Sequence, residues 1–189
     1  MRICVYCSSS SALAPVYQQA ASELGRLIGI RGHELVYGGS TTGTMGLLAD
    51  AARQEGARVT GVIPERMVAY GIADQQADEL IVTATMAERK EAMESRAEAF
   101  VALPGGFGTL EELLQVLTLK QLGYHDSPIA MVSVEGIYGS LLAYFEALYD
   151  AGFAKPAYRQ LYCVTTLPQE AIDHVESYRS ADLPDKWFL

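Results

Sequence analysis

The sequence predicts an α/β protein in which helices cover both faces of a doubly wound, mostly parallel sheet. Short apolar runs, typical of buried strands, alternate along the chain with segments whose apolar residues recur at helical spacing. The connections are short, as in Rossmann-like folds. With 189 residues, 50% of them hydrophobic, the chain suffices for one domain, which we place at residues 1–180, followed by an irregular tail at 181–189.

The first half of the chain contains four of the predicted strands. The strand that opens it is almost continuously apolar, and the helix that follows carries Ala20, Leu24 and Ile28 on one face. Pro64 stops the third strand, because proline cannot donate to a ladder. In order, we expect a strand at residues 2–7, a helix at 16–30, a strand at 34–37, a helix at 43–55, strands at 58–63 and 79–83, and a helix at 86–96.

The second half of the chain continues the alternation. A continuous apolar run predicts a strand at 99–103, and Leu110, Leu113 and Leu117 recur at helical spacing after it. The remaining expected elements are strands at 129–134 and 162–165 and helices at 138–151 and 169–176. In such a sheet the ligand lies beyond the carboxyl ends of the strands, so the loops there are the ones to search.

One of these loops has the sequence Pro-Gly-Gly-Phe-Gly-Thr-Leu-Glu-Glu, at residues 104–112. It lies at a strand-to-helix turn, where three glycines allow a sharp bend with exposed N–H groups and the helix dipole favours an anion. We interpret it as a phosphate-binding turn followed by a carboxylate, Glu112. The alternative is structural, because Thr109 and Glu112 also have the spacing of a helix capping box.

Two other loops argue against common nucleotide-binding motifs. A dinucleotide fingerprint needs G-x-G-x-x-G after the first strand, whereas residues 8–11 are four serines. Residues 38–44 have the glycine spacing of a P-loop, but Thr44 occupies the position of the phosphate-binding lysine. Each loop has two interpretations that remain open: the serines line a ligand pocket or form a solvated turn, and the glycines bind a ligand or allow close helix packing.

Composition narrows the possible partners and the location. A formal net charge of −9 argues against binding to nucleic acid or to an anionic membrane. The sequence shows neither a secretory leader nor an apolar run long enough to span a bilayer, so we expect a cytoplasmic protein. We expect the three cysteines to be reduced, with Cys4 and Cys7 on opposite sides of a strand, and we expect no metal site.

The glycine-rich turn resembles the signature of the LOG family, the cytokinin-activating phosphoribohydrolases formerly mislabelled as lysine decarboxylases. Four departures from the family pattern are Ser40 for glycine, Thr44 for leucine, Gly71 for an acidic residue and Leu119 for tryptophan. Further matches follow in family order over most of the chain: Val-Tyr-Gly-Gly at 36–39, Gly-Thr-Met-Gly at 43–46, Gly-Val-Ile-Pro at 61–64, Arg89 and Lys90 with Met93, and Gln-Leu-Gly-Tyr-His at 121–125.

This resemblance implies hydrolysis of the N-glycosidic bond of a nucleoside 5′-monophosphate, a cytokinin riboside 5′-monophosphate or AMP, to free base and ribose 5-phosphate. It implies no metal or organic cofactor. In the family the arginine of the Arg-Lys pair works with the motif glutamate, so Arg89 and Glu112 are the expected catalytic residues. The expected substrate-binding residues are Ser8, Gly38, Gly39, Gly43, Met45, Gly46, Met86, Lys90, Gly105, Gly106, Phe107, Gly108, Thr109, Leu110, Glu111 and Thr118.

Two other classes of function are weighed against this one. A lysine decarboxylase would need a Schiff-base lysine for pyridoxal phosphate, and no lysine lies in a recognisable motif of that kind. A carrier or sensor that binds a nucleotide or a pterin cofactor without catalysis stays open, because related Rossmann-like proteins bind such cofactors. The pair of Arg89 and Glu112 speaks against a carrier, which gains nothing from a carboxylate beside an anionic ligand.

The central helix also predicts an assembly. Val116 and Leu119 are expected on the side opposite its leucines, where a surface helix is normally polar. Two apolar faces need two partners, so we expect a homodimer formed by this helix and its copy. The leucines are Leu110, Leu113, Leu114 and Leu117.

Overall fold

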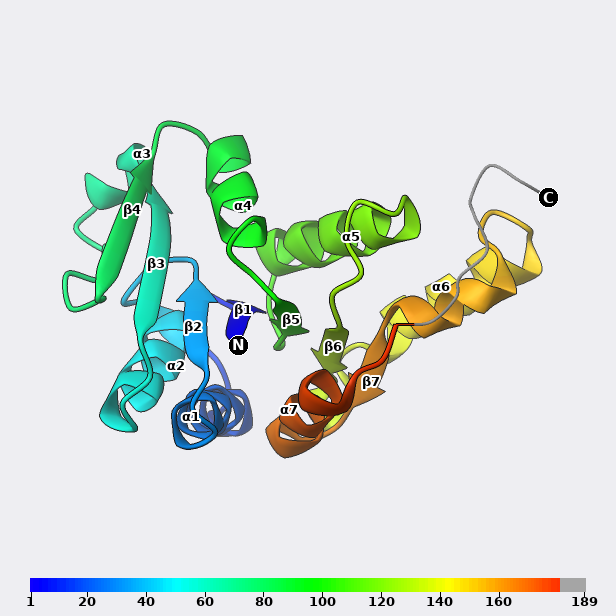
Figure 1. The fold of residues 1–189 in the computed structure, drawn as a ribbon, viewed down its shortest axis with the longest axis horizontal. Coiled ribbons are helices and arrows are strands. Elements are labelled where there is room, and N and C mark those ends of the chain that lie inside the picture. Colours follow the sequence, from blue (N-terminus) through cyan, green and yellow to red (C-terminus); the bar gives the residue numbers. More distant parts are fainter. Residues whose placement is uncertain (181–189) are drawn as a thin grey trace.

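A computed structural model describes residues 1–180; the tail predicted at 181–189 lies outside the described residues. At its centre is a seven-stranded sheet in the order β4-β3-β2-β1-β5-β6-β7, and every neighbouring pair is parallel (Figure 1). The predicted fold class is therefore confirmed. The strands are β1 (Arg2–Tyr6), β2 (Glu34–Tyr37), β3 (Val59–Pro64), β4 (Glu79–Thr83), β5 (Ala99–Ala102), β6 (Ile129–Val132) and β7 (Cys163–Thr165).

Helices cover both faces of this sheet. In Figure 1, α1, α2 and α7 lie on one side of it, and α4, α5 and α6 lie on the other. No helix within residues 1–180 has the length and apolar character needed to cross a membrane. The helices are α1 (Pro15–Ile30), α2 (Gly43–Gln54), α3 (Glu65–Val68), α4 (Met86–Glu94), α5 (Phe107–Gln121), α6 (Gly139–Asp150) and α7 (Pro168–Ser177), with 3₁₀ turns at Val134–Gly136 and Pro156–Leu161.

The alternating side chains of the central strand divide the interior into two cores. On β1, Ile3 and Val5 face the core under α1, α2 and α7, whereas Cys4 and Tyr6 face the core under α4, α5 and α6. Cys7 belongs to the first core, so Cys4 and Cys7 do lie on opposite sides of the sheet. This separation excludes a redox disulfide between these two thiols in this fold.

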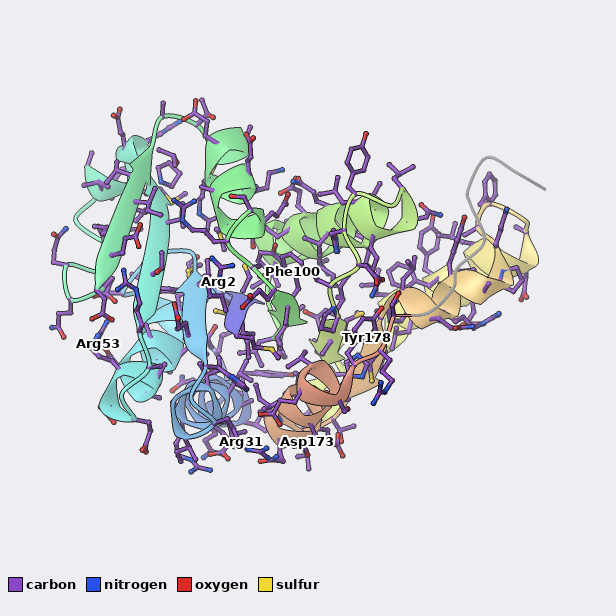
Figure 2. The ribbon with its side chains drawn as sticks, viewed as in Figure 1. Arg2, Arg31, Arg53, Phe100, Asp173 and Tyr178 are labelled. Atoms are coloured by element: carbon purple, nitrogen blue, oxygen red, sulfur yellow. The ribbon has the colours of Figure 1, made fainter. Side chains whose placement is uncertain are left out.

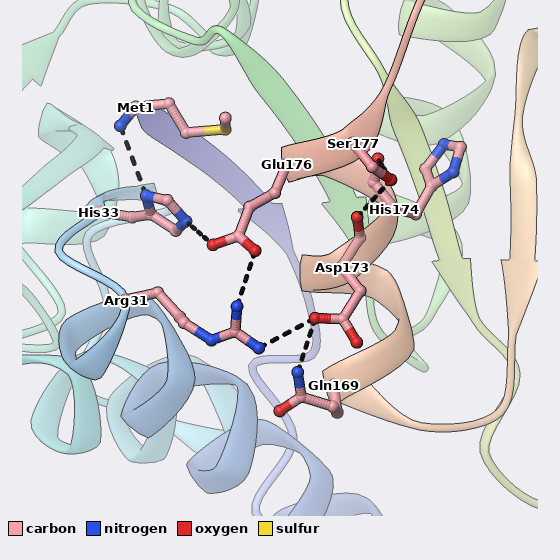
Figure 3. A network of polar contacts seen from close by, with 8 residues as sticks. All are labelled: Met1, Arg31, His33, Gln169, Asp173, His174, Glu176 and Ser177. Atoms are coloured by element: carbon pink, nitrogen blue, oxygen red, sulfur yellow. Dashed lines mark hydrogen bonds and ion pairs between the residues drawn. The ribbon is translucent and has the colours of Figure 1, made fainter.

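A polar network fastens α7 to the start of the chain (Figure 3). Arg31 donates to Glu176 at 2.8 Å and to Asp173 at 2.9 Å, and the His33 Nε2 lies 2.9 Å from the Glu176 carboxylate. These groups are partly exposed, so each pair contributes at most about 1 kcal/mol to stability. The network closes the first core over the end of the sheet where the strands begin, remote from the loops at their carboxyl ends.

The structure adds three elements that the sequence pattern did not predict. They are α3, which begins directly after Pro64, and the 3₁₀ turns at Val134–Gly136 and Pro156–Leu161. All three are too short to show a periodic apolar pattern. Pro64, which was predicted to follow the third strand, is the last residue of β3, and its Cα is in register with that of Thr83. The bounds of the other elements differ from the predicted ones by at most about two residues at each end. This is the usual ambiguity of helix and strand termini.

The central helix α5 differs from its prediction in a way that matters for assembly. Val116 is fully buried, together with Leu113, against the sheet, so the prediction that Val116 lies on the opposite face is wrong. Residues three and four apart share a helix face, which places Leu113, Val116 and Leu117 together. Leu114 is the leucine that projects outward, with 42% of its surface exposed.

Candidate active site

A cavity of about 600 Å³ lies at the carboxyl ends of the central strands. Four parts of the chain form it: the serine loop after β1, the glycine turn after β2, the segment between β3 and β4, and the facing ends of α4 and α5. It lies where ligands bind in open parallel sheets. Its lining residues are Cys7, Ser8, Ser9, Ser10, Ser11, Gly38, Ser40, Thr42, Met45, Met67, Tyr70, Ile72, Met86, Arg89, Gly106, Phe107, Gly108, Thr109, Glu111 and Glu112.

The most unusual feature of this cavity is a buried ion pair at its wall. Arg89 on α4 donates from Nη1 to the Oε1 of Glu112 on α5 at 2.6 Å, and each residue is only 6% exposed. Arg89 is held from a second side, because its Nε donates to the carbonyl of Val62 at 3.0 Å. Gly38 makes room for it: a Cβ there would lie 2.2 Å from the Arg89 Nη2. The guanidinium is therefore fixed against the edge of the sheet.

The protonation of Glu112 reflects two opposing effects. Burial raises the pKa of its carboxyl above the ordinary value of 4.5, while the charge and hydrogen bond of Arg89 act to lower that pKa. Burial is the larger effect, and the pKa is raised overall. A buried carboxylate whose orientation is fixed by an arginine is well suited to stabilise positive charge that develops on a neighbouring atom.

Beside this pair, the turn after β5 presents free N–H groups. Helix α5 begins at Phe107, and Gly106, which precedes it, makes no side-chain capping bond. The first helical hydrogen bond at this end is donated by Leu110, to the Gly106 carbonyl at 3.1 Å, so Phe107, Gly108 and Thr109 have no backbone or side-chain acceptor within residues 1–180. Three open N–H groups at the start of a 15-residue helix are the kind of donors that favour an anion.

The glycines of this turn have different roles. A Cβ at Gly106 or Gly108 would meet nothing within 4 Å, so their missing side chains leave open space in front of the N–H groups. A Cβ at Gly105, in contrast, would lie 2.0 Å from the Thr109 hydroxyl oxygen. That hydroxyl donates to the Cys7 carbonyl at 3.1 Å. Thr109 is the third residue of α5 and Gly106 is its N-cap, so the capping-box alternative for Thr109 and Glu112 is wrong.

At the glycine turn after β2, the N–H groups at the start of the helix are bonded to the protein itself. The Ser8 carbonyl accepts from the backbone N–H of Thr44 at 3.0 Å and of Met45 at 3.3 Å. The Thr44 hydroxyl accepts from the Ser8 N–H at 2.9 Å and lies 3.0 Å from the Ser8 carbonyl. Thr44, which occupies the position of a P-loop lysine, thus ties this helix to the serine loop.

The structure brings most of the predicted residues to the cavity but not all of them. Those that do not line it are Gly39, Gly43, Gly46, Lys90, Gly105, Leu110 and Thr118. Gly43 and Gly46 line a neighbouring cavity of about 270 Å³, and Lys90 forms an ion pair with Glu111. Thr118 lies more than two turns beyond Thr109, about 13 Å along α5 at a rise of about 1.5 Å per residue.

The sequence did not single out one wall of the cavity. Met67, Tyr70 and Ile72 come from the segment between β3 and β4, and Ser40 and Thr42 come from the turn after β2. The segment was among the loops to be searched, and the family resemblance marked only Gly71 in it. The signal that could have identified Met67, Tyr70 and Ile72 is their position after a strand in a parallel sheet. Within residues 1–180, no cluster of side chains suited to hold a metal ion occurs.

Comparison with known proteins places the chain in a family. A family model described as "Possible lysine decarboxylase" matches residues 45–175. A cytokinin riboside 5′-monophosphate phosphoribohydrolase of Arabidopsis thaliana is 42% identical over 177 residues, which are 94% of this chain and 82% of that protein. A probable enzyme of the same name from Oryza sativa subsp. japonica is 40% identical over 94% of this chain and 72% of its own length. The chain belongs to the LOG family.

The solved structures similar to this LOG protein share its fold. A molybdenum cofactor binding protein from the phototrophic bacterium Rippkaea orientalis superposes with a TM-score of 0.72 at 20% identity, over 93% of this chain and 95% of that one. The molybdenum cofactor carrier protein of Chlamydomonas reinhardtii gives 0.69 at 24% identity, over 93% and 95%. At this level of identity the likeness shows the fold alone. The two LOG relatives at about 40% identity are both named as phosphoribohydrolases.

Proposed function

We propose that this LOG protein hydrolyses the N-glycosidic bond of a nucleoside 5′-monophosphate, a cytokinin riboside 5′-monophosphate or AMP, to free base and ribose 5-phosphate. The observation that carries the proposal is the juxtaposition of the Arg89 and Glu112 ion pair with the open N–H groups of α5 in one cavity. The names of the relatives at about 40% identity support the same reaction.

The chemistry follows from where the charges lie. The 5′-phosphate binds the N–H groups at the start of α5, which places the ribose near Glu112. As the bond between C1′ and the base nitrogen breaks, its electron pair goes to the base and C1′ gains oxocarbenium character, which the Glu112 carboxylate stabilises. Water forms the new bond to C1′ and loses a proton, and the departing base gains one, either from this water or from solvent. Arg89 stays protonated and orients the carboxylate.

We propose that the base contacts the apolar residues of the cavity. Met45, Met67, Tyr70, Ile72 and Met86 line the cavity and contribute apolar surface. A base with an apolar N6 substituent buries more surface against such a wall than unmodified adenine does. We therefore propose that both AMP and an N6-prenylated AMP are bound, with the prenylated nucleotide bound more tightly.

The test is the release of free base from a panel of nucleoside monophosphates. Purified protein is incubated with AMP and with N6-isopentenyl-AMP, and the products are separated by chromatography. We expect adenine or N6-isopentenyladenine together with an equal amount of ribose 5-phosphate. Tight binding of a nucleotide that is recovered intact would instead support the carrier alternative, which so far rests on likeness of fold.

We also propose a homodimer, on a basis that differs from the sequence prediction. An apolar hollow of about 120 Å³ on the outer side of α5 is lined by Leu114, Phe145, Tyr149 and Leu161 among others. Thr118, implicated by family resemblance, lines this hollow and not the cavity of its own chain, so a role for Thr118 in binding would require a second copy. A monomeric mass in light scattering at micromolar concentration would refute this proposal.

The proposed location is cytoplasmic. Cys4, Cys7 and Cys163 are all free thiols, and burial raises the pKa of the Cys7 thiol to about 12. Three unpaired thiols fit a reducing compartment. Cell fractionation with detection of the untagged protein tests this, and recovery in a membrane or extracellular fraction would contradict it.

A further inference from the structure

Asp74 is a buried carboxylate that the proposed reaction does not use. It lies in the segment between α3 and β4 and is only 4% exposed. Its Oδ2 accepts from the Tyr37 hydroxyl at 2.6 Å and from the Arg53 Nη2 at 2.6 Å, and its Oδ1 accepts from the Gln76 N–H at 2.9 Å. Three donors from three parts of the chain therefore meet at one side chain. A buried charge persists at such a place only when it is paired and hydrogen-bonded in this way.

The donors of this cluster come from the rigid part of the fold. Tyr37 is the last residue of β2 and is fully buried, and Arg53 projects from α2 (Figure 2). Burial and the neighbouring Asp74 raise the pKa of the Tyr37 hydroxyl, which therefore stays a donor. The carboxylate of Asp74 thus fixes a loop to a central strand and to the helix that follows this strand.

The same loop forms one wall of the cavity. Tyr70 and Ile72 line the cavity just before Asp74 in the chain, and Met67, from the preceding α3, lines it as well. The wall is joined to the turn after β2 by two backbone bonds of 2.9 Å, from Thr41 N–H to the Ile72 carbonyl and from Asp74 N–H to the Gly39 carbonyl. Tyr70 itself is 67% exposed, so the wall is held at its two ends, by α3 directly after β3 and by the bonds around Asp74.

We propose that Asp74 is a positioning residue that, through its bonds to Tyr37 and Arg53, sets the place of the wall that contacts the base. This inference rests on the proposed function and deepens it, because it assigns control of base affinity to a residue outside the cavity. Arg89, Glu112 and the phosphate-binding turn belong to α4, α5 and the turn before α5, none of which bonds to Asp74. Loosening the wall therefore weakens binding in ground state and transition state alike.

The test uses Asp74→Asn, which keeps the shape of the side chain and removes its charge. We expect KM for N6-isopentenyl-AMP to rise about tenfold, the effect of losing one or two charge-assisted hydrogen bonds, while kcat changes less than about threefold. Tyr37→Phe removes only the hydroxyl donor and should raise KM in the same direction by a smaller factor. The matched control is Asp78→Asn, because Asp78 accepts from the Val59 N–H at 2.7 Å at the far end of the same segment.

A merely structural role of Asp74 predicts a different pattern. Lower stability would reduce the active fraction, and hence apparent kcat, without changing KM, and it would appear equally in Asp78→Asn. An unchanged KM in well-folded Asp74→Asn overturns the inference. If the wild type releases no base, the proposed function fails and the inference is judged by calorimetry with AMP: Kd should rise about tenfold in Asp74→Asn, and an equal Kd overturns it.

Discussion

The turn after β2 and the turn after β5 look alike in sequence and differ in what they leave open. Each is rich in glycine, follows a buried strand next to β1, and leads into a helix of 12 residues or more. At α2 the N–H groups of Thr44 and Met45 are occupied by the Ser8 carbonyl. At α5 the corresponding N–H groups of Gly108 and Thr109 have no acceptor among residues 1–180, and both residues line the cavity.

The glycines follow the same division. A Cβ at Gly43 would lie 2.5 Å from the Ser9 carbonyl carbon, and a Cβ at Gly46 would lie 2.2 Å from the Thr41 carbonyl oxygen. Gly106 and Gly108 have empty space at the same place. Glycine at the turn into α2 thus permits close packing against the protein itself, whereas glycine at the turn into α5 leaves room for a ligand. Glycine spacing alone does not distinguish the two uses.

The largest difference is expected at the sixth residue of each helix, which is Leu48 in α2 and Glu112 in α5. Glu112→Gln should lower kcat by about a thousandfold, because it removes the charge that stabilises the transition state. Its unfolding free energy should also fall by about 3 kcal/mol, because the buried Arg89 guanidinium loses the charge with which it pairs, so kcat is measured on folded protein. Leu48→Ala should cost about 3 kcal/mol of unfolding free energy.

These variants are compared by product release and by urea unfolding. Glu91→Gln, which neutralises an exposed carboxylate on α4, serves as the matched charge control and should keep full activity. A well-folded Glu112→Gln protein with turnover near that of the wild type would remove Glu112 from the reaction.

The next expected difference is in the stability of alanine variants at Gly43, at the start of α2, and at Gly108, in α5. Gly43 has a φ of +61°, so Gly43→Ala combines backbone strain with a clash against the serine loop and should destabilise the fold by about 3 kcal/mol. Gly108→Ala is the matched variant in the open turn. It lies in the first turn of α5 with free space around it and should be neutral or slightly stabilising, by at most about 1 kcal/mol. Equal losses in urea unfolding would show that the two turns are packed alike.

The smallest expected effect concerns pH. Only the ionised Glu112 carboxylate stabilises the oxocarbenium-like state, so kcat/KM should fall as pH decreases through the pKa of this group. Burial raises that pKa, which places the acid limb above pH 4.5, the ordinary value for a glutamate. Below it, kcat/KM should drop about tenfold per pH unit. An acid limb at or below the ordinary value would mean that a different group controls the reaction.

The comparison also shows what the sequence could and could not predict. All seven strands and the six longer helices were predicted, because hydrophobic periodicity is a local property. Which glycine turn is occupied by protein was not predicted, because the turn before α2 is closed by Ser8, which lies 36 residues before Thr44. The partnership of Arg89 and Glu112 was inferred from family resemblance, since the charge pattern of α4 alone fits a surface helix.

One wrong prediction and one discarded alternative have the same physical origin. The outward-facing Val116 and the capping-box alternative both treat α5 as an isolated helix. Packing decides otherwise: Thr109 bonds to the Cys7 carbonyl, Glu112 pairs with Arg89, and Val116 enters the second core. Tertiary contacts override local patterns most often at the residues that form a site.

The central claim is that the open turn before α5 holds the 5′-phosphate of the substrate, and paired substrates test it most directly. The measurement is kcat/KM for AMP and for adenosine, on the wild type and on Gly106→Val, whose side chain would fill the open space before the N–H groups. We predict that the wild type prefers AMP by at least about a hundredfold, the worth of two charge-assisted hydrogen bonds, and that Gly106→Val erases this preference. Equal efficiencies for AMP and adenosine on the wild type would contradict the claim.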